Sequence, residues 1–361
     1  MHGTHHQQLR LCLSGVINVS LDDEQWCQAS LPVKDGGLGI RSTLQLAPSA
    51  FLASASGTRP LVSVLLQNTM PSPLDPSWDH ALTVWNSMGG NTVPAGTASS
   101  SQKLWDRPVI DKSKACLIST AVDDVANARL RAAWAPHSGD WLNAPPLSAV
   151  GLRMDNETLR IATGLRLGTP LCAPHICPCK APVDARGIHG LSCRQSASRS
   201  QRHAQINDII HRALIRAGVQ AVRKPSGTLV GSGLRPHGAT LIPWTRGKCL
   251  AWDATCADTL AESHLPSTRS QAGAAAEHLA MTKTQKYSSF SPTYHFVPVA
   301  VETLGSWNMD GLQFIKDLGR RTTAITNDPR ETAFLLQRLS VAVQRGNATS
   351  VKGSLPVKKT E

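Results

Sequence analysis

Aromatic residues and long apolar stretches are both scarce in this 361-residue chain. Phe, Trp and Tyr together make up 4% of it, and nine of these few aromatic residues are Trp. No run of 18 or more residues is continuously apolar, so we expect no membrane-spanning helix. The first residues lack the basic-then-apolar order of a secretory signal. We therefore expect an intracellular protein with reduced cysteines.

Acidic residues are outnumbered, and the imbalance is concentrated in the C-terminal half. Residues 1–195 carry 16 basic and 14 acidic side chains, whereas residues 196–361 carry 21 and 11. A positive charge confined to one half favours a polyanion as the partner of that half. The 41% of apolar residues excludes a wholly disordered chain, and the length suits two to three domains of about 150 residues.

Apolar periodicity predicts a helical first half and an α/β second half. A Gly-rich turn over 34–39 precedes a predicted helix around 44–55, and the Pro-, Ser- and Gly-rich residues 70–101 predict a linker. Further elements are predicted as helices over 119–134, 158–167, 206–217, 271–288, 310–318 and 329–343, a hairpin around 244–247, and a strand over 296–301. Pro298 places that strand at a sheet edge.

Four potential metal ligands lie within seventeen residues. Cys177, Cys179, His189 and Cys193 offer three thiolates and an imidazole, the set that a closed tetrahedral zinc site needs. The surrounding stretch is too polar to form a core of its own and would gain folding energy from the metal. Cys172 and His175 lie just upstream, and either is an alternative ligand.

Candidate residues for phosphodiester hydrolysis surround the predicted hairpin. A metal-dependent nuclease needs carboxylates that hold Mg²⁺ and a lysine that stabilises charge. Asp253 ends the second hairpin strand, and Lys286 follows on the next predicted helix. Glu302 and Asp208 are further acidic candidates. An aspartate that closes a strand is, however, often only a turn or cap residue.

Several motifs together resemble a known family. They are Cys177-Pro-Cys179, His189-Gly-Leu-Ser-Cys193, Arg202-His203, Arg235-Pro-x-Gly238, Trp252-Asp253-x-Thr255, Lys283-Thr-Gln-Lys286-Tyr287, Glu302-Thr-Leu-Gly305 and Arg320-Arg321. The chain resembles the C-terminal part of non-long-terminal-repeat retrotransposon polyproteins, which carry a reverse transcriptase, a zinc knuckle and a restriction-like endonuclease. Residues 31–41 and 47–53 resemble the segment that follows the polymerase core.

The resemblance implies an α+β chain with a helical N-terminal region, a small zinc knuckle and an α/β restriction-endonuclease-like domain with a mixed central sheet. The expected divisions are a post-polymerase remnant (1–69), a linker (70–101), a helical connector (102–170), the knuckle (171–195), a PD-(D/E)xK nuclease domain (196–345) and a disordered basic tail (346–361). The polymerase itself is missing, because the Asp123-Asp124 pair lies in a helical pattern rather than in a tight hairpin.

The sequence departs from the family motif at the nuclease centre. His237 stands where the motif has an acid, and Thr255 stands where related restriction enzymes have a lysine. Imidazole is a poor Mg²⁺ ligand and brings no negative charge, so the metal affinity should fall. The family's Lys-Tyr pair points instead to Lys286 as the catalytic lysine.

The resemblance implies structural zinc, Mg²⁺ or Mn²⁺ for catalysis, DNA as the main partner with RNA as an alternative, and a nuclear location. The basic residues expected to contact nucleic acid are Arg202, Arg235, Arg246, Lys248, Arg320 and Arg321. Two other hypotheses remain: a catalytically dead nucleic-acid-binding remnant, and a non-functional pseudogene copy.

Overall fold

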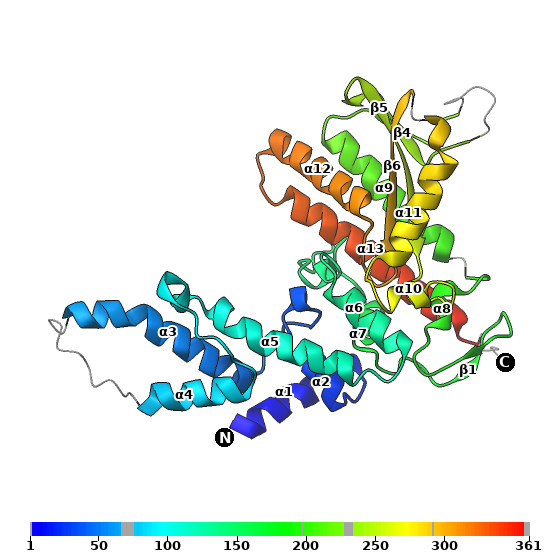
Figure 1. Cartoon of the computed structure of the whole chain (residues 1–361). Coiled ribbons are helices and arrows are strands. Elements are labelled where there is room, and N and C mark those ends of the chain that lie inside the picture. Colours follow the sequence, from blue (N-terminus) through cyan, green and yellow to red (C-terminus); the bar gives the residue numbers. More distant parts are fainter. Residues whose placement is uncertain (1, 66–75, 197, 227–233, 291, 357–361) are drawn as a thin grey trace. The chain divides into compact units, whose positions relative to one another are not determined.

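The computed structural model describes residues 2–65, 76–196, 198–226, 234–290 and 292–356 (Figure 1). The chain divides into two compact units, Met1–Ala121 and Val122–Glu361. This boundary lies inside the stretch 102–170 that was predicted to be one helical connector. Among the described residues, no helix is both long enough and apolar enough to cross a membrane.

The first unit is a helical assembly. Its helices are α1 (His2–Ile17), α2 (Asp23–Ala29), α3 (Thr43–Leu65), α4 (Pro76–Ser87) and α5 (Gln102–Ser119), with short 3-10 turns η1 (Val33–Asp35) and η2 (Gly96–Ser100). Asp22 caps α2 through a capping box with Gln25. Helices α3, α4 and α5 share one apolar cluster.

The predicted linker at 70–101 is wrong for 76–87, which form α4, and for the short turn η2, whereas 88–95 are irregular as predicted. Helix α4 places Trp78 and Trp85 seven residues apart on one face, where both rings pack edge-on against Trp105 of α5. Trp85 is fully buried, and its indole N–H donates to the backbone oxygen of Trp105 at 2.8 Å. Residues 70–75 lie outside the described residues. The polar composition of the segment hid this narrow aromatic stripe.

The second unit opens with two capped helices. Asp123 accepts a hydrogen bond from the Ala126 amide at the start of α6 (Asp124–Trp134), and Asp155 accepts one from the Thr158 amide at the start of α7 (Asn156–Leu167). The short η3 turn (Asp140–Leu142) lies between them. Asp123 therefore caps the helix that Asp124 begins.

A four-stranded mixed sheet forms the centre of this unit. The order is β3 (Ala221–Arg223), β4 (Gly238–Thr245), β5 (Lys248–Ala257) and β6 (Tyr294–Glu302), with β3, β4 and β5 antiparallel and β5 and β6 parallel. The mixed sheet, the hairpin and the edge position of β6 agree with the sequence predictions. Gly238 faces Trp252 across the hairpin, and a Cβ there would lie 2.1 Å from the Trp252 ring. Only glycine fits this position.

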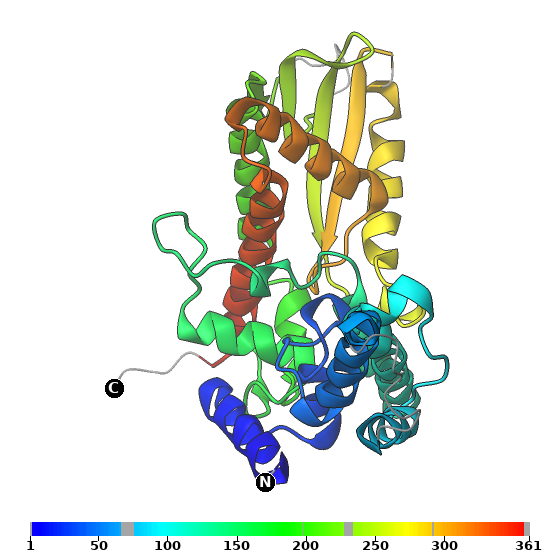
Figure 2. The same ribbon diagram turned by 90° about the vertical axis from the view of Figure 1, so that its left-hand side faces the viewer.

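Helices cover both faces of the sheet (Figure 2). Helices α9 (Ser198–Arg216), α12 (Met309–Thr326) and α13 (Glu331–Ser354) cover one face, and α11 (Ala274–Lys286) covers the other, after a short α10 (Leu265–Thr268) and before η4 (Ser288–Phe290). Alternation along β5 directs Trp252 toward α9 and Ala251 toward α11. This alternation decides which candidate residues lie on the same face of the sheet and can therefore contact one another.

Helix α13 is longer than the sequence predicted. It continues to Ser354, so the prediction of disorder from residue 346 is wrong for 346–354, and 357–361 lie outside the described residues. The extension buries small polar residues: the Asn347 amide donates to the Thr303 oxygen at 2.7 Å, and Ser350 is fully buried. Because these contacts are polar, apolar periodicity does not reveal them.

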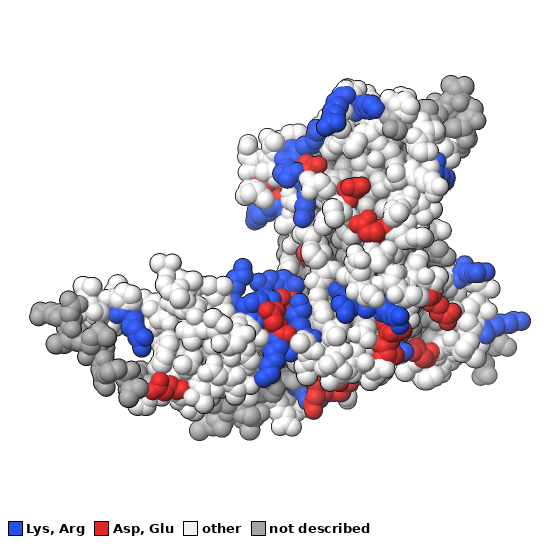
Figure 3. All heavy atoms as spheres, in the orientation of Figure 1, with Lys and Arg blue, Asp and Glu red and all other residues white. Residues whose placement is uncertain are grey.

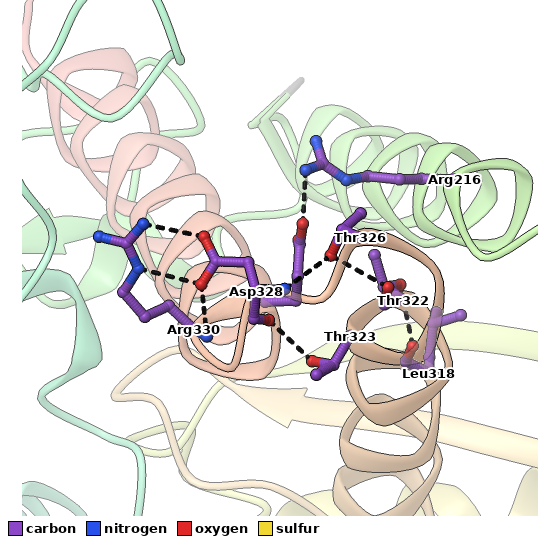
Figure 4. A network of polar contacts seen from close by, with 8 residues as sticks. Arg216, Leu318, Thr322, Thr323, Thr326, Asp328 and Arg330 are labelled. Carbon is purple, nitrogen blue, oxygen red and sulfur yellow. Dashed lines mark hydrogen bonds and ion pairs between the residues drawn. The ribbon is translucent and has the colours of Figure 1, made fainter.

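The turn between α12 and α13 is held by a polar network (Figure 4). Asp328 accepts from the Arg330 amide at 2.9 Å and pairs with the Arg330 guanidinium at 2.8 Å. Arg216 of α9 pairs with the buried carboxylate of Glu331. The network ties α9 to the start of α13. Helix α13 begins at Glu331 with Arg330 at its N-cap, so Asp328 holds the preceding turn and does not cap the helix.

Candidate metal centre and nuclease site

A small hairpin and a one-turn helix position the four metal-ligand candidates. Strands β1 (His175–Ile176) and β2 (Pro182–Val183) pair, and the turn between them carries Cys177 and Cys179. Lys180 adopts a left-handed conformation with φ 70°, and its amide donates to the Cys177 oxygen at 2.7 Å. Helix α8 (His189–Ser192) supplies the third ligand, and the fourth follows directly.

The four ligand atoms converge on one point. Cys177 Sγ lies 3.8 Å from Cys193 Sγ, and Cys179 Sγ lies 3.2 Å from His189 Nε2. All four ligand atoms lie within 4.8 Å of one another. A tetrahedral zinc ion with Zn–S bonds of about 2.3 Å separates its sulfur ligands by about 3.8 Å. The residues therefore fit zinc.

Neither alternative ligand belongs to this cluster. Cys172 Sγ lies 3.5 Å from the Asp184 oxygen, and both ring nitrogens of His175 lie 2.9 Å from backbone oxygens, those of Ala173 and Ser354. His175 therefore links the knuckle to the end of α13 and does not face the metal position.

The two thiols of the turn differ in acidity. Burial raises the pKa of Cys177 to about 11, and the neighbouring Cys193 thiol adds to the effect. Hydrogen bonds, first of all one with the backbone of Ala181, lower the pKa of Cys179 to about 7. Zinc binds thiolates, so its binding here has to release protons.

The knuckle packs directly on α13. A Cβ on Gly190 would lie 2.8 Å from the Ser350 oxygen and 2.9 Å from the Val351 Cα, both backbone atoms. Such close approach requires glycine at this position. A metal bound by all four ligands would have no open coordination position and would serve to fix the knuckle against α13.

Two of the nuclease candidates, Asp253 and His237, meet on the α11 face of the sheet. The Asp253 side chain of β5 is only 3% exposed and contacts two basic groups. Lys283 Nζ lies 3.1 Å from Asp253 Oδ2, and His237 Nδ1 lies 2.6 Å from Asp253 Oδ1. The Tyr287 hydroxyl donates to the Arg235 oxygen at 3.0 Å and so holds the loop that carries His237.

His237 Nδ1 contacts two groups at once. It lies 3.0 Å from the Ala254 amide N–H, which needs an acceptor, and 2.6 Å from Asp253 Oδ1, which needs a donor. One nitrogen cannot serve both. The tautomer of His237 decides which of the two bonds forms, and in either case His237 Nδ1 lies against the buried Asp253 carboxylate.

The charges around Asp253 determine its protonation. Burial alone would raise the pKa of Asp253, but contacts with His237 and Lys283 outweigh burial and lower this pKa. Asp253 is therefore ionised at neutral pH. Burial and the Asp253 carboxylate raise the pKa of Tyr287, whose hydroxyl remains a donor.

Lys283, and not the Lys286 that the sequence indicated, lies beside Asp253. Lys286 is exposed, and its Nζ lies 5.2 Å from the centre of the Tyr287 ring rather than beside Asp253. Lys283 and Tyr287 are four residues apart and share one face of α11, whereas Lys286 does not. The spacing Lys283-x-x-x-Tyr287 is visible in the sequence, but the sequence does not show which face of α11 packs on β5.

The other two acidic candidates lie elsewhere. Glu302 is fully buried, and its Oε1 accepts from the Ala275 and Ala276 amides at 3.0 and 3.2 Å, so it caps α11. It pairs four positions beyond Asp253 in the sheet, about 13 Å away along the strand. Asp208 lies on α9, across the sheet from Asp253.

The six basic residues expected to contact nucleic acid lie in different environments. Arg202 is 2% exposed and donates to Asn347, Ser350 and Leu191, so it is a structural residue. The guanidinium of Arg321 stacks at 3.8 Å over the Trp244 ring, and Arg320 pairs with Asp317. The remaining three are exposed or half-buried: Arg235, Arg246 and Lys248. Figure 3 shows basic side chains gathered where the β4–β5 hairpin and α12 lie.

Comparison of the chain with known protein families gave no match, and comparison with curated proteins gave none either.

Proposed function

We propose that the chain is a nucleic-acid-binding protein with a structural zinc knuckle and a weakened restriction-like DNA-nicking centre, similar to the C-terminal part of non-long-terminal-repeat retrotransposon polyproteins. The observation that carries this proposal is the contact of Lys283 Nζ with Asp253 Oδ2 at 3.1 Å. Such a centre needs a carboxylate with a lysine beside it. Asp253 supplies the carboxylate from inside β5 and not from the strand's end, where the sequence predicted it. The basic C-terminal half supplies the charge for a nucleic acid.

The side chains available at Asp253 determine which metal ion could bind there. Lys283 contacts Asp253 Oδ2, which leaves Asp253 Oδ1 for a cation, with the imidazole of His237 next to it. One carboxylate and one imidazole fit Mn²⁺ better than Mg²⁺, which prefers oxygen ligands. A bound cation would neutralise charge on the scissile phosphate. Lys283 is placed to stabilise the same phosphate, and Tyr287 fixes the loop of His237.

Nicking of supercoiled plasmid tests the proposal. The full chain is incubated with plasmid and either Mg²⁺ or Mn²⁺, as wild type and as His237→Asp. We expect slow cleavage by the wild type, faster with Mn²⁺, and an increase of at least about tenfold in His237→Asp with Mg²⁺, because a second carboxylate restores the oxygen ligands.

Variants in the His237→Asp background identify the groups. Asp253→Asn and Lys283→Ala should abolish nicking, while Lys286→Ala, which changes the same charge on the same helix, should retain it. Folded His237→Asp protein that fails to nick with either metal would overturn the nuclease proposal.

A second candidate is a binding protein without catalysis. The 3% exposure of Asp253 favours it, because a buried carboxylate between two basic side chains resembles a structural ion pair. In that case DNA binding would fall steeply with salt, while no variant would cleave.

A further inference from the structure

A groove of about 540 Å³ lies between α9 and α13, away from the zinc knuckle ligands and from Asp253. The two helices run side by side in Figure 2. The polar residues that line the groove are Gln201, Gln205 and Asp208 of α9, Arg223 of β3, and Arg338 and Arg345 of α13. The proposed nuclease centre, on the other face of the sheet, uses none of them.

The groove has a positive charge that its own acid does not balance. Asp208 is the one acidic residue among the lining residues, and it already pairs with Arg212 at 2.8 Å and Arg223 at 3.1 Å. Within the described chain, no carboxylate forms an ion pair with Arg338 or Arg345. Two guanidinium groups therefore remain for an external anion.

Crowding of basic groups strengthens this conclusion. Burial, together with the charges of Arg212 and Arg216, lowers the pKa of Arg338. An anion in the groove would offset this repulsion. Gln201 and Gln205 add amide groups that can donate hydrogen bonds to phosphate oxygens.

The basic residues of α13 continue beyond the groove as a stripe. Arg338, Arg345 and Lys352 are seven residues apart, and each step spans about 10 Å along one helix face. The Arg345 guanidinium is fixed at the groove by donating to the Arg153 oxygen at 2.7 Å. A row of separated cations matches an extended polyanion better than a single free phosphate.

We infer that the groove between α9 and α13 binds the phosphodiester backbone of a nucleic acid, with Arg338 and Arg345 on separate phosphates. The inference rests on the proposed function, because it supplies the binding surface for the same substrate. It is nevertheless independent of Asp253, Lys283 and His237.

Fluorescence anisotropy of the full chain tests the inference with labelled duplex DNA, single-stranded DNA and hairpin RNA over a range of NaCl concentrations. The test variant is Arg338→Gln/Arg345→Gln. Its matched control is Arg269→Gln/Arg330→Gln, which removes the same charge from exposed arginines that pair with Asp124 and Asp328. Circular dichroism and the Tm are measured to check that both variants fold.

For the test variant we expect binding to weaken at least about tenfold at 0.1 M salt and the slope of log Kd against log salt to fall by about 2, with duplex DNA as probe. The control should stay within about twofold of wild type. Equal losses in both variants would overturn the inference, because they would report net charge rather than the groove. Stabilisation of the wild type by inorganic phosphate alone, without nucleic-acid binding, would overturn it as well.

The three probes and the nicking assay separate the possible failures. The strand type that responds most to Arg338→Gln/Arg345→Gln identifies the backbone that the groove takes. Nicking by His237→Asp with unchanged binding in the groove variant would overturn the groove alone. A groove effect without nicking by His237→Asp would overturn the nuclease proposal alone.

Discussion

Lys283 Nζ lies 3.1 Å from Asp253 Oδ2, although the two residues are 30 positions apart and come from α11 and β5. Asp253 is 3% exposed, so its charge depends on partners rather than on water. Lys283 is therefore a stability residue as well as the catalytic candidate.

Lys283→Met should destabilise the fold by about 1–3 kcal/mol, because it leaves a buried carboxylate with one basic neighbour fewer. Lys286→Met is the control, since Lys286 is exposed, and we expect a change of less than about 0.5 kcal/mol. Urea unfolding followed by Trp fluorescence measures both. Equal stability of the two variants would mean that the Lys283–Asp253 contact does not form in solution.

The purified chain should bind one zinc ion, and Cys193→Ser should lose it together with several degrees of Tm. Cys172→Ser is the matched control, because Cys172 lies outside the four-ligand cluster. Elemental analysis counts the metal, and thermal melting with and without a chelator reports its effect on the fold. Zinc loss in Cys172→Ser with retention in Cys193→Ser would disprove this ligand set.

The structural features of this chain differ in how well the sequence alone predicts them. The spacing of Cys177, Cys179, His189 and Cys193 identifies the metal cluster, because short-range chain geometry brings such ligands together. The hairpin and the edge strand follow equally from local signals such as Pro298 and Gly247. Local patterns suffice where neighbours in sequence are neighbours in space.

The sequence did not predict the contacts that depend on the register between distant elements. Only the packing of α11 on β5 selects Lys283 over Lys286, and only α13 explains why Arg202 is buried. The role of Glu302 also depends on tertiary contacts: it is the last residue of β6, where an active-site acid could lie, but it accepts from two amides at the start of α11. Residue types with suitable chemistry therefore identify candidate site residues in the sequence, and tertiary contacts show which of these candidates lie together.

The stability of the fold should decrease as pH falls from 6.5 toward 4 because of His203. Burial, and next the nearby His237, lower the pKa of His203 to about 4, and His203 Nε2 accepts from the Cys256 amide at 3.1 Å. The unfolded chain takes up this proton near pH 6.5, before the folded chain does. The stabilising effect is thus complete above pH 6.5 and is lost as pH falls through 4, at most about 3 kcal/mol.

His203→Gln is the comparison for this effect, since its amide oxygen can accept the Cys256 bond and does not titrate. The difference in unfolding free energy between wild type and His203→Gln, measured from pH 7.5 to 4, should change in favour of the variant at low pH. A difference that is constant with pH would show that His203 does not stay neutral in the fold.

Glu302→Ala should lower stability by about 2–3 kcal/mol, because the Ala275 and Ala276 amides lose their acceptor at the start of α11. Glu302→Gln keeps an acceptor oxygen and should cost less. Chemical unfolding of both variants gives the free energies. If Glu302→Gln abolished nicking by the His237→Asp form while leaving stability intact, Glu302 would be a catalytic residue and not a helix cap.

Gly190→Ala should separate the knuckle from α13. Its Cβ would lie 2.8 Å from the Ser350 oxygen and 2.9 Å from the Val351 Cα, and these backbone atoms can make room only if the two elements move apart. We expect a loss of about 1–3 kcal/mol and faster transfer of zinc to a chelator. Gly353→Ala on α13 is the control, because nothing lies within 4 Å of its Cβ position and alanine favours the helix. A Gly190→Ala protein as stable as Gly353→Ala, with unchanged zinc transfer, would show that the knuckle does not pack on α13.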